Sequence, residues 1–146
     1  MQAAIGVEQL RKFPSFIERR RYNWDRLRAA LENVQDQLIL PEPAENSMPS
    51  WFGFMISVHP GSGLDRNRVT RYIEDHNVQT RLLFSGNLIR HPCFDSIRGT
   101  DAYRVAGGLD ATEFIMNHSF WVGVYPGMTD EKIDFMAKTI KEALKT

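Results

Sequence analysis

A long amphipathic helix in the N-terminal part constrains the fold of this chain more than any other feature. Large apolar residues recur there every seven positions, at Ile17, Trp24, Leu31 and Leu38. This spacing places the side chains on one face of a helix and predicts that the face is buried. Pro14 fits the first turn of such a helix, where its missing N–H costs little. We therefore expect a helix over residues 1–12, a bend near Phe13, and a long helix from Pro14 to about Leu38.

Three later stretches have the pattern of β-strands: residues 51–58, 78–83 and 120–125. The first alternates along its length, with Phe54 and Ile56 on one face, which is the period of a strand. Gly53 leaves a gap on the opposite face. A ligand or a neighbouring side chain can fill such a gap, and packing by a side chain is the more frequent outcome. The third stretch is almost entirely apolar, and so we expect it to be central in the sheet.

Helices are expected between and after these strands. Asp65 is placed to cap a short helix that ends near Asn77, and Thr129 is placed to cap the last helix. Asp110 and Glu113 have the spacing of a capping box, which predicts a short helix through residue 116. Helices that connect strands at this spacing indicate an α/β or α+β layer. We expect an α+β fold, in which a long kinked helix precedes a three-stranded sheet flanked by helices.

The composition argues against several classes of function. At 146 residues the chain suits one domain. Lysine plus arginine and aspartate plus glutamate both total 18, so no net charge attracts nucleic acid or an anionic membrane. No apolar run approaches the roughly 20 residues that span a bilayer, and the N-terminus lacks the pattern of a signal peptide. We expect a cytoplasmic protein that binds neither nucleic acid nor membrane.

No catalytic set or metal site can be assembled from the residue types. Cys93 is the only cysteine, which excludes an internal disulfide and a complete cysteine-based zinc or iron–sulfur site from this chain alone. The four histidines lack metal-ligand spacing, and no lysine is placed to form a Schiff base. The basic run Arg19–Arg21 is expected to be a solvated helix face. The first helix begins at Met1 without an N-cap residue, which suggests a fragment of a longer protein.

The stretch from Thr80 to Phe94 is the first candidate for a ligand site. Leu82 to Phe84 is expected to end a buried strand, and Ser85 to Asn87 then has the residues of a turn. Basic and amide side chains that could hold an anion or a sugar flank this turn, at Arg81, Asn87 and Arg90. The alternative is that these residues have only the structural roles usual beside strands and in turns.

Four blocks of the sequence carry a family resemblance: MQAAIGVEQL, PSWFGF, TRLLFSGNLIRHP and IMNHSFWVGVYPGMT. Together they resemble the C-terminal part of the DegT-type sugar-nucleotide aminotransferase family. Within that family the likeness is strongest to the nucleotide-sugar 3-dehydrases, typified by CDP-4-keto-6-deoxyglucose 3-dehydrase of lipopolysaccharide deoxysugar synthesis. The resemblance covers essentially the whole chain.

The resemblance implies a fold-type I aminotransferase whose large N-terminal domain holds pyridoxal or pyridoxamine phosphate and the catalytic base. Residues 1–40 would correspond to the helix that leaves that domain, and residues 41–146 to the small C-terminal α+β domain. The implied reaction removes the C3 hydroxyl of a nucleotide sugar, with the cofactor as electron sink. The implied partners are a second copy in a homodimer and, in iron–sulfur-dependent members, a reductase, with the [2Fe–2S] ligands outside this chain. On this interpretation the chain is inactive alone.

The same resemblance assigns roles in the site. It places Asn87 and Arg90 at the nucleotide sugar, with Arg81 and Phe84 at the edge. Asparagine can hold sugar hydroxyls, arginine can hold the diphosphate, and Phe84 can pack on a ring. The chain departs from the family pattern at His91 and Cys93 and in a longer segment over residues 96–103, which leaves the substrate open.

The sequence leaves two alternatives open. The chain could belong to a sugar-nucleotide aminotransferase, because a histidine at the cofactor position favours dehydration and a lysine favours amino transfer, and that position lies outside these residues. It could instead be a non-catalytic module that self-associates through the apolar face between Ile17 and Leu38.

Overall fold

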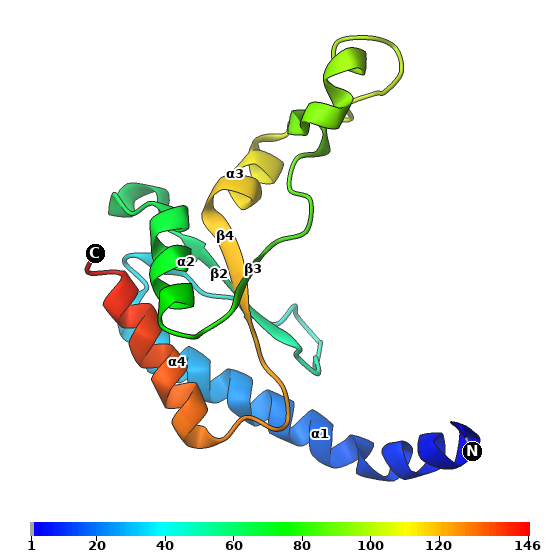
Figure 1. The fold of residues 1–146 in the computed structure, drawn as a ribbon, viewed down its shortest axis with the longest axis vertical. Coiled ribbons are helices and arrows are strands. Elements are labelled where there is room, and N and C mark those ends of the chain that lie inside the picture. Colours follow the sequence, from blue (N-terminus) through cyan, green and yellow to red (C-terminus); the bar gives the residue numbers. More distant parts are fainter. Residues whose placement is uncertain (1) are drawn as a thin grey trace.

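The computed structural model describes residues 2–146 and shows a four-stranded sheet with helices packed against one of its faces (Figure 1). The strands are β1 (Leu38–Ile39), β2 (Gly53–Val58), β3 (Thr80–Leu82) and β4 (Ser119–Gly123). Their order across the sheet is β1-β2-β4-β3, and every neighbouring pair is antiparallel. The apolar strand β4 is therefore central, as predicted, and β3 is an edge strand.

The prediction of a three-stranded sheet was wrong because of residues 38 and 39. These residues form β1, in which Leu38 pairs with Val58 and Ile39 pairs with Ser57. Leu38 is only 1% exposed, so its side chain is buried from a strand rather than from a helix. Leu38 therefore continues the seven-residue spacing of the helix by coincidence, because it belongs to a strand.

Helix α1 (Gln2–Leu31) is one continuous helix that contains Pro14. It ends seven residues earlier than predicted, where the 3-10 turn η1 (Glu32–Val34) leads toward β1. The sequence indicated a break near Phe13, but the helix continues through it, and its axis changes direction within the N-terminal half (Figure 1). Only the C-terminal half of α1 reaches the core, through Trp24, Leu27 and Leu31.

Two further helices cover the same face of the sheet. Helix α2 (Arg66–Asp75) begins at Asp65, whose carboxylate accepts a hydrogen bond from the backbone N–H of Arg68. Helix α4 (Asp130–Ala143) begins at Thr129, whose hydroxyl accepts from the backbone N–H of Lys132. Both predicted N-caps are confirmed, because short polar side chains there satisfy donors that the first helical turn leaves free.

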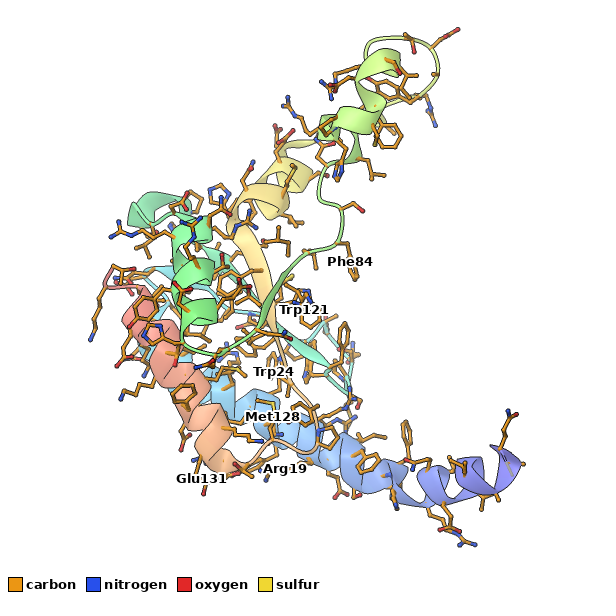
Figure 2. The ribbon with its side chains drawn as sticks, viewed as in Figure 1. Arg19, Trp24, Phe84, Trp121, Met128 and Glu131 are labelled. Carbon is orange, nitrogen blue, oxygen red and sulfur yellow. The ribbon has the colours of Figure 1, made fainter. Side chains whose placement is uncertain are left out.

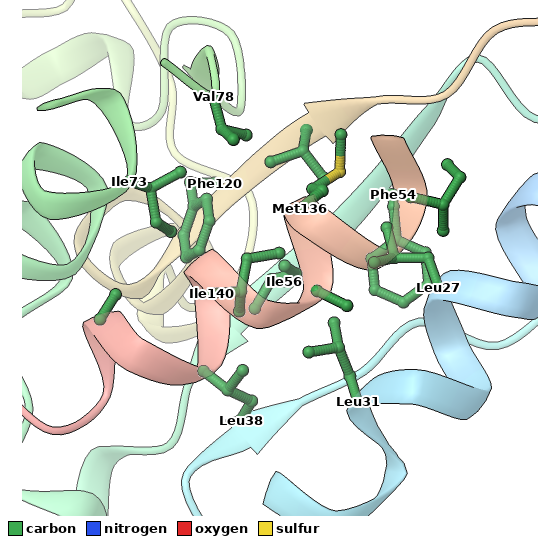
Figure 3. Close-up of a cluster of buried hydrophobic side chains, with 14 of the residues drawn as sticks. Leu27, Leu31, Leu38, Phe54, Ile56, Ile73, Val78, Phe120, Met136 and Ile140 are labelled. Carbon is green, nitrogen blue, oxygen red and sulfur yellow. The ribbon is translucent and has the colours of Figure 1, made fainter. Parts of the chain in front are cut away.

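The core lies between the sheet and these three helices. Alternate residues of the two central strands point into it, and Phe54, Ile56, Phe120 and Val122 have no exposed surface. Figure 3 shows that side chains from α1, β2, β4 and α4 meet there. On the opposite face, a Cβ atom at Gly53 would lie 2.7 Å from the Trp121 ring. The prediction that a side chain fills this gap is therefore confirmed.

The prediction that the arginine run on α1 is a solvated helix face is wrong. Arg19 donates to the backbone carbonyl of Met128 at 2.9 Å and to the carboxylate of Asp130 at 2.7 Å. Figure 2 shows Arg19 and Met128 near each other. Arg20 donates to a carbonyl at residue 51, and Arg21 donates to carbonyls at residues 48 and 49. These contacts attach the helix to the loop before β2 and to the turn before α4.

Residues 88–118 form an arm that extends from one end of the sheet (Figure 1). It contains the 3-10 turns η3 (Leu88–Arg90) and η4 (Pro92–Ile97), an irregular loop, and helix α3 (Asp110–His118). No residue from 88 to 118 is buried. The predicted capping box is wrong: the N-cap of α3 is Leu109, which has no side-chain cap, and Asp110 is the first helical residue.

Candidate functional site

The loop between β3 and the arm is more exposed than its sequence suggested. Leu82 is 53% exposed and Phe84 is 82% exposed, so the expected buried strand end is wrong at both positions. Two features explain this. β3 lies at the sheet edge, and Phe84 adopts a left-handed backbone conformation with φ of 47°, which ends the strand. The Phe84 side chain lies outside the sheet (Figure 2).

Asn87 is the most deeply placed of the predicted site residues, with 3% of its surface exposed. Its amide NH₂ donates to the Glu113 carboxylate at 2.8 Å, and its amide oxygen accepts from the backbone N–H of Ile89 at 3.3 Å. Its backbone N–H lies 3.4 Å from the Met116 sulfur. Both ends of the amide are thus engaged within the protein, and Asn87 fixes the turn that starts η3.

Arg90 meets Asn87 through a shared carboxylate. Its Nε donates to the same Glu113 oxygen at 2.6 Å, while 62% of its side chain stays exposed. Its two Nη groups make no hydrogen bond within residues 2–146. The Glu113 carboxylate therefore holds the inner edge of the guanidinium, and the outer N–H groups are available to an anion.

Glu113 belongs to this cluster and not to the predicted capping box. The hydrogen bond from Arg90 lowers the pKa of its carboxyl below the ordinary value, with a further contribution from Asn87. Burial acts in the opposite direction and is outweighed. The carboxylate consequently remains charged near neutrality. No sequence spacing predicts this contact, because Glu113 is 26 residues from Asn87 and 23 from Arg90.

The other two predicted residues lie apart from this cluster. Arg81 pairs with Trp121 across the sheet, on the face without helices, and lines a cavity of about 620 Å³ beside α4. Phe84 lines a smaller cavity of about 230 Å³ with Arg66 and His91. The structure thus joins Asn87 and Arg90 through Glu113 but places Arg81 in a different cavity.

A third cavity, of about 530 Å³, lies within the arm itself. One wall is formed by residues 86–89 and the turn η4, and the other by residues 102–112. Its lining includes the aromatic residues Phe94 and Tyr103 and the basic residues Arg98 and Arg104. No sequence pattern indicates this cavity, because its two walls meet only where the chain returns along the arm.

No lysine occurs between Thr80 and His118, and the turn at residues 60–63 has neither the length nor the lysine of a phosphate-binding loop. Within residues 2–146, no three His, Cys, Asp or Glu side chains are grouped to hold a metal ion. In the same range, no helix is both long and apolar enough to cross a bilayer.

The arrangement is that of aminotransferase-fold enzymes. A solved structure of Escherichia coli GDP-4-keto-6-deoxy-D-mannose-3-dehydratase with bound hydrated PLP superposes with a TM-score of 0.79 and 26% identity. The match covers 94% of this chain and 34% of that enzyme. An aminotransferase from Psychrobacter cryohalolentis, at 20% identity and a TM-score of 0.77, shares the fold.

The chain belongs to the DegT/DnrJ/EryC1/StrS aminotransferase family, whose model matches residues 1–141. It is 42% identical to the lipopolysaccharide biosynthesis protein RfbH of Salmonella typhimurium and to a dTDP-4-dehydro-2,6-dideoxy-D-glucose 3-dehydratase of Saccharopolyspora spinosa. Each alignment covers 97% of this chain but only 32% and 30% of the relative. The chain therefore spans about a third of the length of the curated relatives that it matches.

Proposed function

We propose that this chain is the C-terminal part of a pyridoxal or pyridoxamine phosphate-dependent nucleotide-sugar 3-dehydrase, and that its role is to bind the nucleotide sugar. Support comes from the 42% identity to a protein named as a 3-dehydratase. A further solved structure, of a GDP-4-keto-6-deoxymannose-3-dehydratase variant, holds GDP-perosamine and superposes with a TM-score of 0.79. Residues 1–40 lead from the cofactor domain, and residues 41–146 form the small domain.

The observation that carries the proposal is the pairing of Arg90 with Glu113. Because Glu113 takes the Nε, the two Nη groups of Arg90 can form a bidentate contact with the diphosphate of a nucleotide sugar. Asn87 acts mainly as a positioning residue, since its amide already holds Glu113 and the η3 turn. Phe84 offers an exposed ring that can pack on a sugar. Arg81 lines a different cavity and belongs to the edge of the proposed site.

The cofactor supplies the electron sink for loss of the C3 hydroxyl when it is bound in the family's large domain. This chain contributes no Schiff-base lysine and no general base to that step. Its own residues bind the diphosphate, orient the sugar and cover it. We include in the proposal a homodimeric enzyme and, for an iron–sulfur-dependent member, a reductase partner, with the [2Fe–2S] ligands outside residues 2–146.

Titration of the purified protein with nucleoside diphosphates tests the proposal. A charge-assisted contact to phosphate contributes about 1.5 to 3 kcal/mol, so Arg90→Ala should lower affinity by roughly 10- to 100-fold. Arg71→Ala is the matched control, because Arg71 is an exposed arginine of α2, remote from the loop in sequence. If Arg90→Ala binds the diphosphate normally but has a lower melting temperature, Arg90 has only a structural role in this loop.

An aminotransferase remains the second candidate, supported by the shared fold of aminotransferase structures and the family to which the chain belongs. Incubation of the full-length enzyme with a 4-keto nucleotide sugar separates the two. Loss of the C3 hydroxyl supports the dehydrase, whereas transfer of an amino group from glutamate to C4 supports the aminotransferase.

The self-association hypothesis needs a different surface from the one that the sequence suggested. The apolar face between Ile17 and Leu38 is largely buried in the chain's own core at Trp24, Leu27 and Leu31. The exposed apolar residues of α1 lie earlier, at Ile5, Val7, Leu10 and Phe13. Analytical ultracentrifugation tests whether they drive association: Leu10→Glu should then shift a dimer to a monomer, and a monomeric wild type would exclude this module.

A further inference from the structure

The arm cavity is built differently from the core of the body. It measures about 530 Å³, within the range of pockets that hold small molecules. Apolar side chains dominate its lining, yet Leu88 is 55% exposed, Val105 is 44% exposed and Phe94 is 36% exposed. Apolar surface that is gathered into a concave site and left uncovered by the chain itself marks a binding surface.

The chemistry of the lining selects for a flat ligand that carries negative charge. Two aromatic residues, Phe94 and Tyr103, line the cavity, and no aspartate or glutamate does. Two arginines, Arg98 and Arg104, are its only ionisable basic groups. Aromatic rings stack on any heterocyclic base, and guanidinium groups bind phosphate.

Several of these groups are held in position before a ligand arrives. The Tyr103 hydroxyl accepts a hydrogen bond from the backbone N–H of Gly99 at 3.1 Å. Arg98 donates from Nε to the carbonyl of Ile89 at 2.9 Å and forms an ion pair with Asp95. Arg104, in contrast, has no hydrogen bond or ion pair within residues 2–146, which leaves its charge free for a ligand.

The cavity is continuous in sequence and structure with the proposed diphosphate site. Asn87, Leu88 and Ile89 line it, and Arg90 is the next residue of the same η3 turn. A ligand whose phosphates lie on the Nη groups of Arg90 could therefore place its other end in the arm.

We propose that the arm cavity binds the heterocyclic base of the nucleotide sugar, with Tyr103 and Phe94 as stacking residues and Arg104 beside the phosphates. This inference rests on the proposed function, because it takes the diphosphate of the same ligand to lie on Arg90. The arm then recognises the base, and Arg90 in the η3 turn recognises the diphosphate.

The experiment compares two probes: a nucleoside diphosphate, either CDP, dTDP or GDP, and inorganic pyrophosphate, which has no base. Tyr103→Ala should weaken binding of the preferred nucleoside diphosphate about 10-fold or more and leave pyrophosphate binding unchanged. Tyr103→Phe keeps the ring and should retain most of the affinity. Arg90→Ala should weaken both probes.

The control for folding is the melting temperature, which Tyr103→Ala should not change, because no residue of the arm is buried. The matched control for aromatic loss is Tyr125→Ala, at a half-exposed tyrosine outside the arm. If the wild-type protein binds the nucleoside diphosphate and pyrophosphate with the same affinity, the base pocket is refuted, but the Arg90 site is not. The base pocket is also refuted if Tyr103→Ala changes the sedimentation coefficient but not the binding of either probe. That result would indicate that a second polypeptide covers the cavity. Loss of binding in Tyr103→Ala but not in Arg90→Ala would instead refute the proposed diphosphate site.

Discussion

The body of this protein and its arm are stabilised in different ways. In the body, the sheet and the helices α1, α2 and α4 enclose one apolar core, whereas no residue of the arm is buried. The chain exposes 9830 Å² of surface, about 2,000 Å² more than the size rule gives for a compact monomer of 16.8 kDa. The arm and the N-terminal half of α1, both largely exposed, contribute to this excess. The body therefore folds around its own core, whereas the arm leaves its side chains exposed or only partly buried.

The connection between the two parts is correspondingly small. Asn87 and Arg90 meet Glu113 on one side of it, and Gly86 approaches Met116 on the other. A few polar contacts and one close backbone approach therefore set the direction of the arm, so mutations at this connection should change how the arm is held more than mutations elsewhere in the arm.

The largest expected contrast is between an apolar truncation in the body and one in the arm. Phe54 has no exposed surface and its ring lies 5.3 Å from that of Trp24. Phe54→Ala should cost about 3 to 5 kcal/mol of stability, through lost burial and the cavity left behind. Val105→Ala, at a residue 44% exposed, should change stability by less than about 0.5 kcal/mol. Urea unfolding followed by circular dichroism measures both, and comparable losses in the two variants would mean that the arm has a core of its own.

The second contrast isolates the contact at the base of the arm. Gly86 has a φ of 60°, and a Cβ atom there would lie 2.7 Å from Cγ of Met116. Gly107 has a similar φ of 80° but nothing within 4 Å of its Cβ position. Left-handed backbone costs an alanine about 1 to 2 kcal/mol at either position, so the additional loss in Gly86→Ala reports the Met116 contact.

Amide hydrogen exchange of α3 is the measurement for this pair, because it detects local opening that a global melt can miss. Faster exchange in Gly86→Ala than in Gly107→Ala is the expected result. Equal exchange rates in the two variants would show that the close approach to Met116 does not hold α3 in place.

A third prediction concerns Leu82, which the sequence placed in a buried strand end. A fully buried leucine would cost about 2 to 5 kcal/mol on truncation to alanine. At 53% exposure on an edge strand, Leu82→Ala should instead cost about 1 kcal/mol or less. Thermal denaturation of Leu82→Ala and Ile56→Ala measures the two stability losses side by side, because Ile56 is a buried residue of β2 on the same sheet face. A cost for Leu82 near that of Ile56 would indicate that another surface covers β3 in solution.

The parts that the sequence predicted are those determined by local patterns. The apolar run at residues 120–125 predicted the central strand, and Asp65 and Thr129 were recognised as helix caps because a cap acts on residues three positions away. Leu38 misled the helix prediction, since the same apolar residue suits a helix face and a short buried strand. The partners of Arg19, Asn87 and Arg90 were not predictable, because they lie 23 to 111 residues away. Asn87 and Arg90 were found as candidates by residue type, but their connection through Glu113 required the folded chain.

The smallest expected effect is electrostatic and separates the arm from the body by pH. The folded pKa of Glu113 is lowered from its ordinary value of 4.5, so its charged form stabilises the arm connection. That contribution is fully present above the ordinary value and is lost as the pH falls through the folded pKa. Amide exchange around residues 86–91 should therefore accelerate as the pH falls from the ordinary value through the lowered folded pKa of Glu113, after correction for the intrinsic exchange rate.

Glu113→Gln provides the control for this pH dependence, because it removes the titrating group while keeping a side chain of the same size. In this variant, exchange at residues 86–91 should already be fast at pH 7 and should respond little to acid. The body should still respond, because hydrogen bonds from Tyr22 and Arg19 lower the pKa of Asp130, and one from Arg26 lowers the pKa of Asp134. Those carboxylates connect α4 to α1, so acid should loosen this contact equally in both proteins. If Glu113→Gln left the acid response of residues 86–91 intact, a group other than Glu113 would control the connection between the arm and the body.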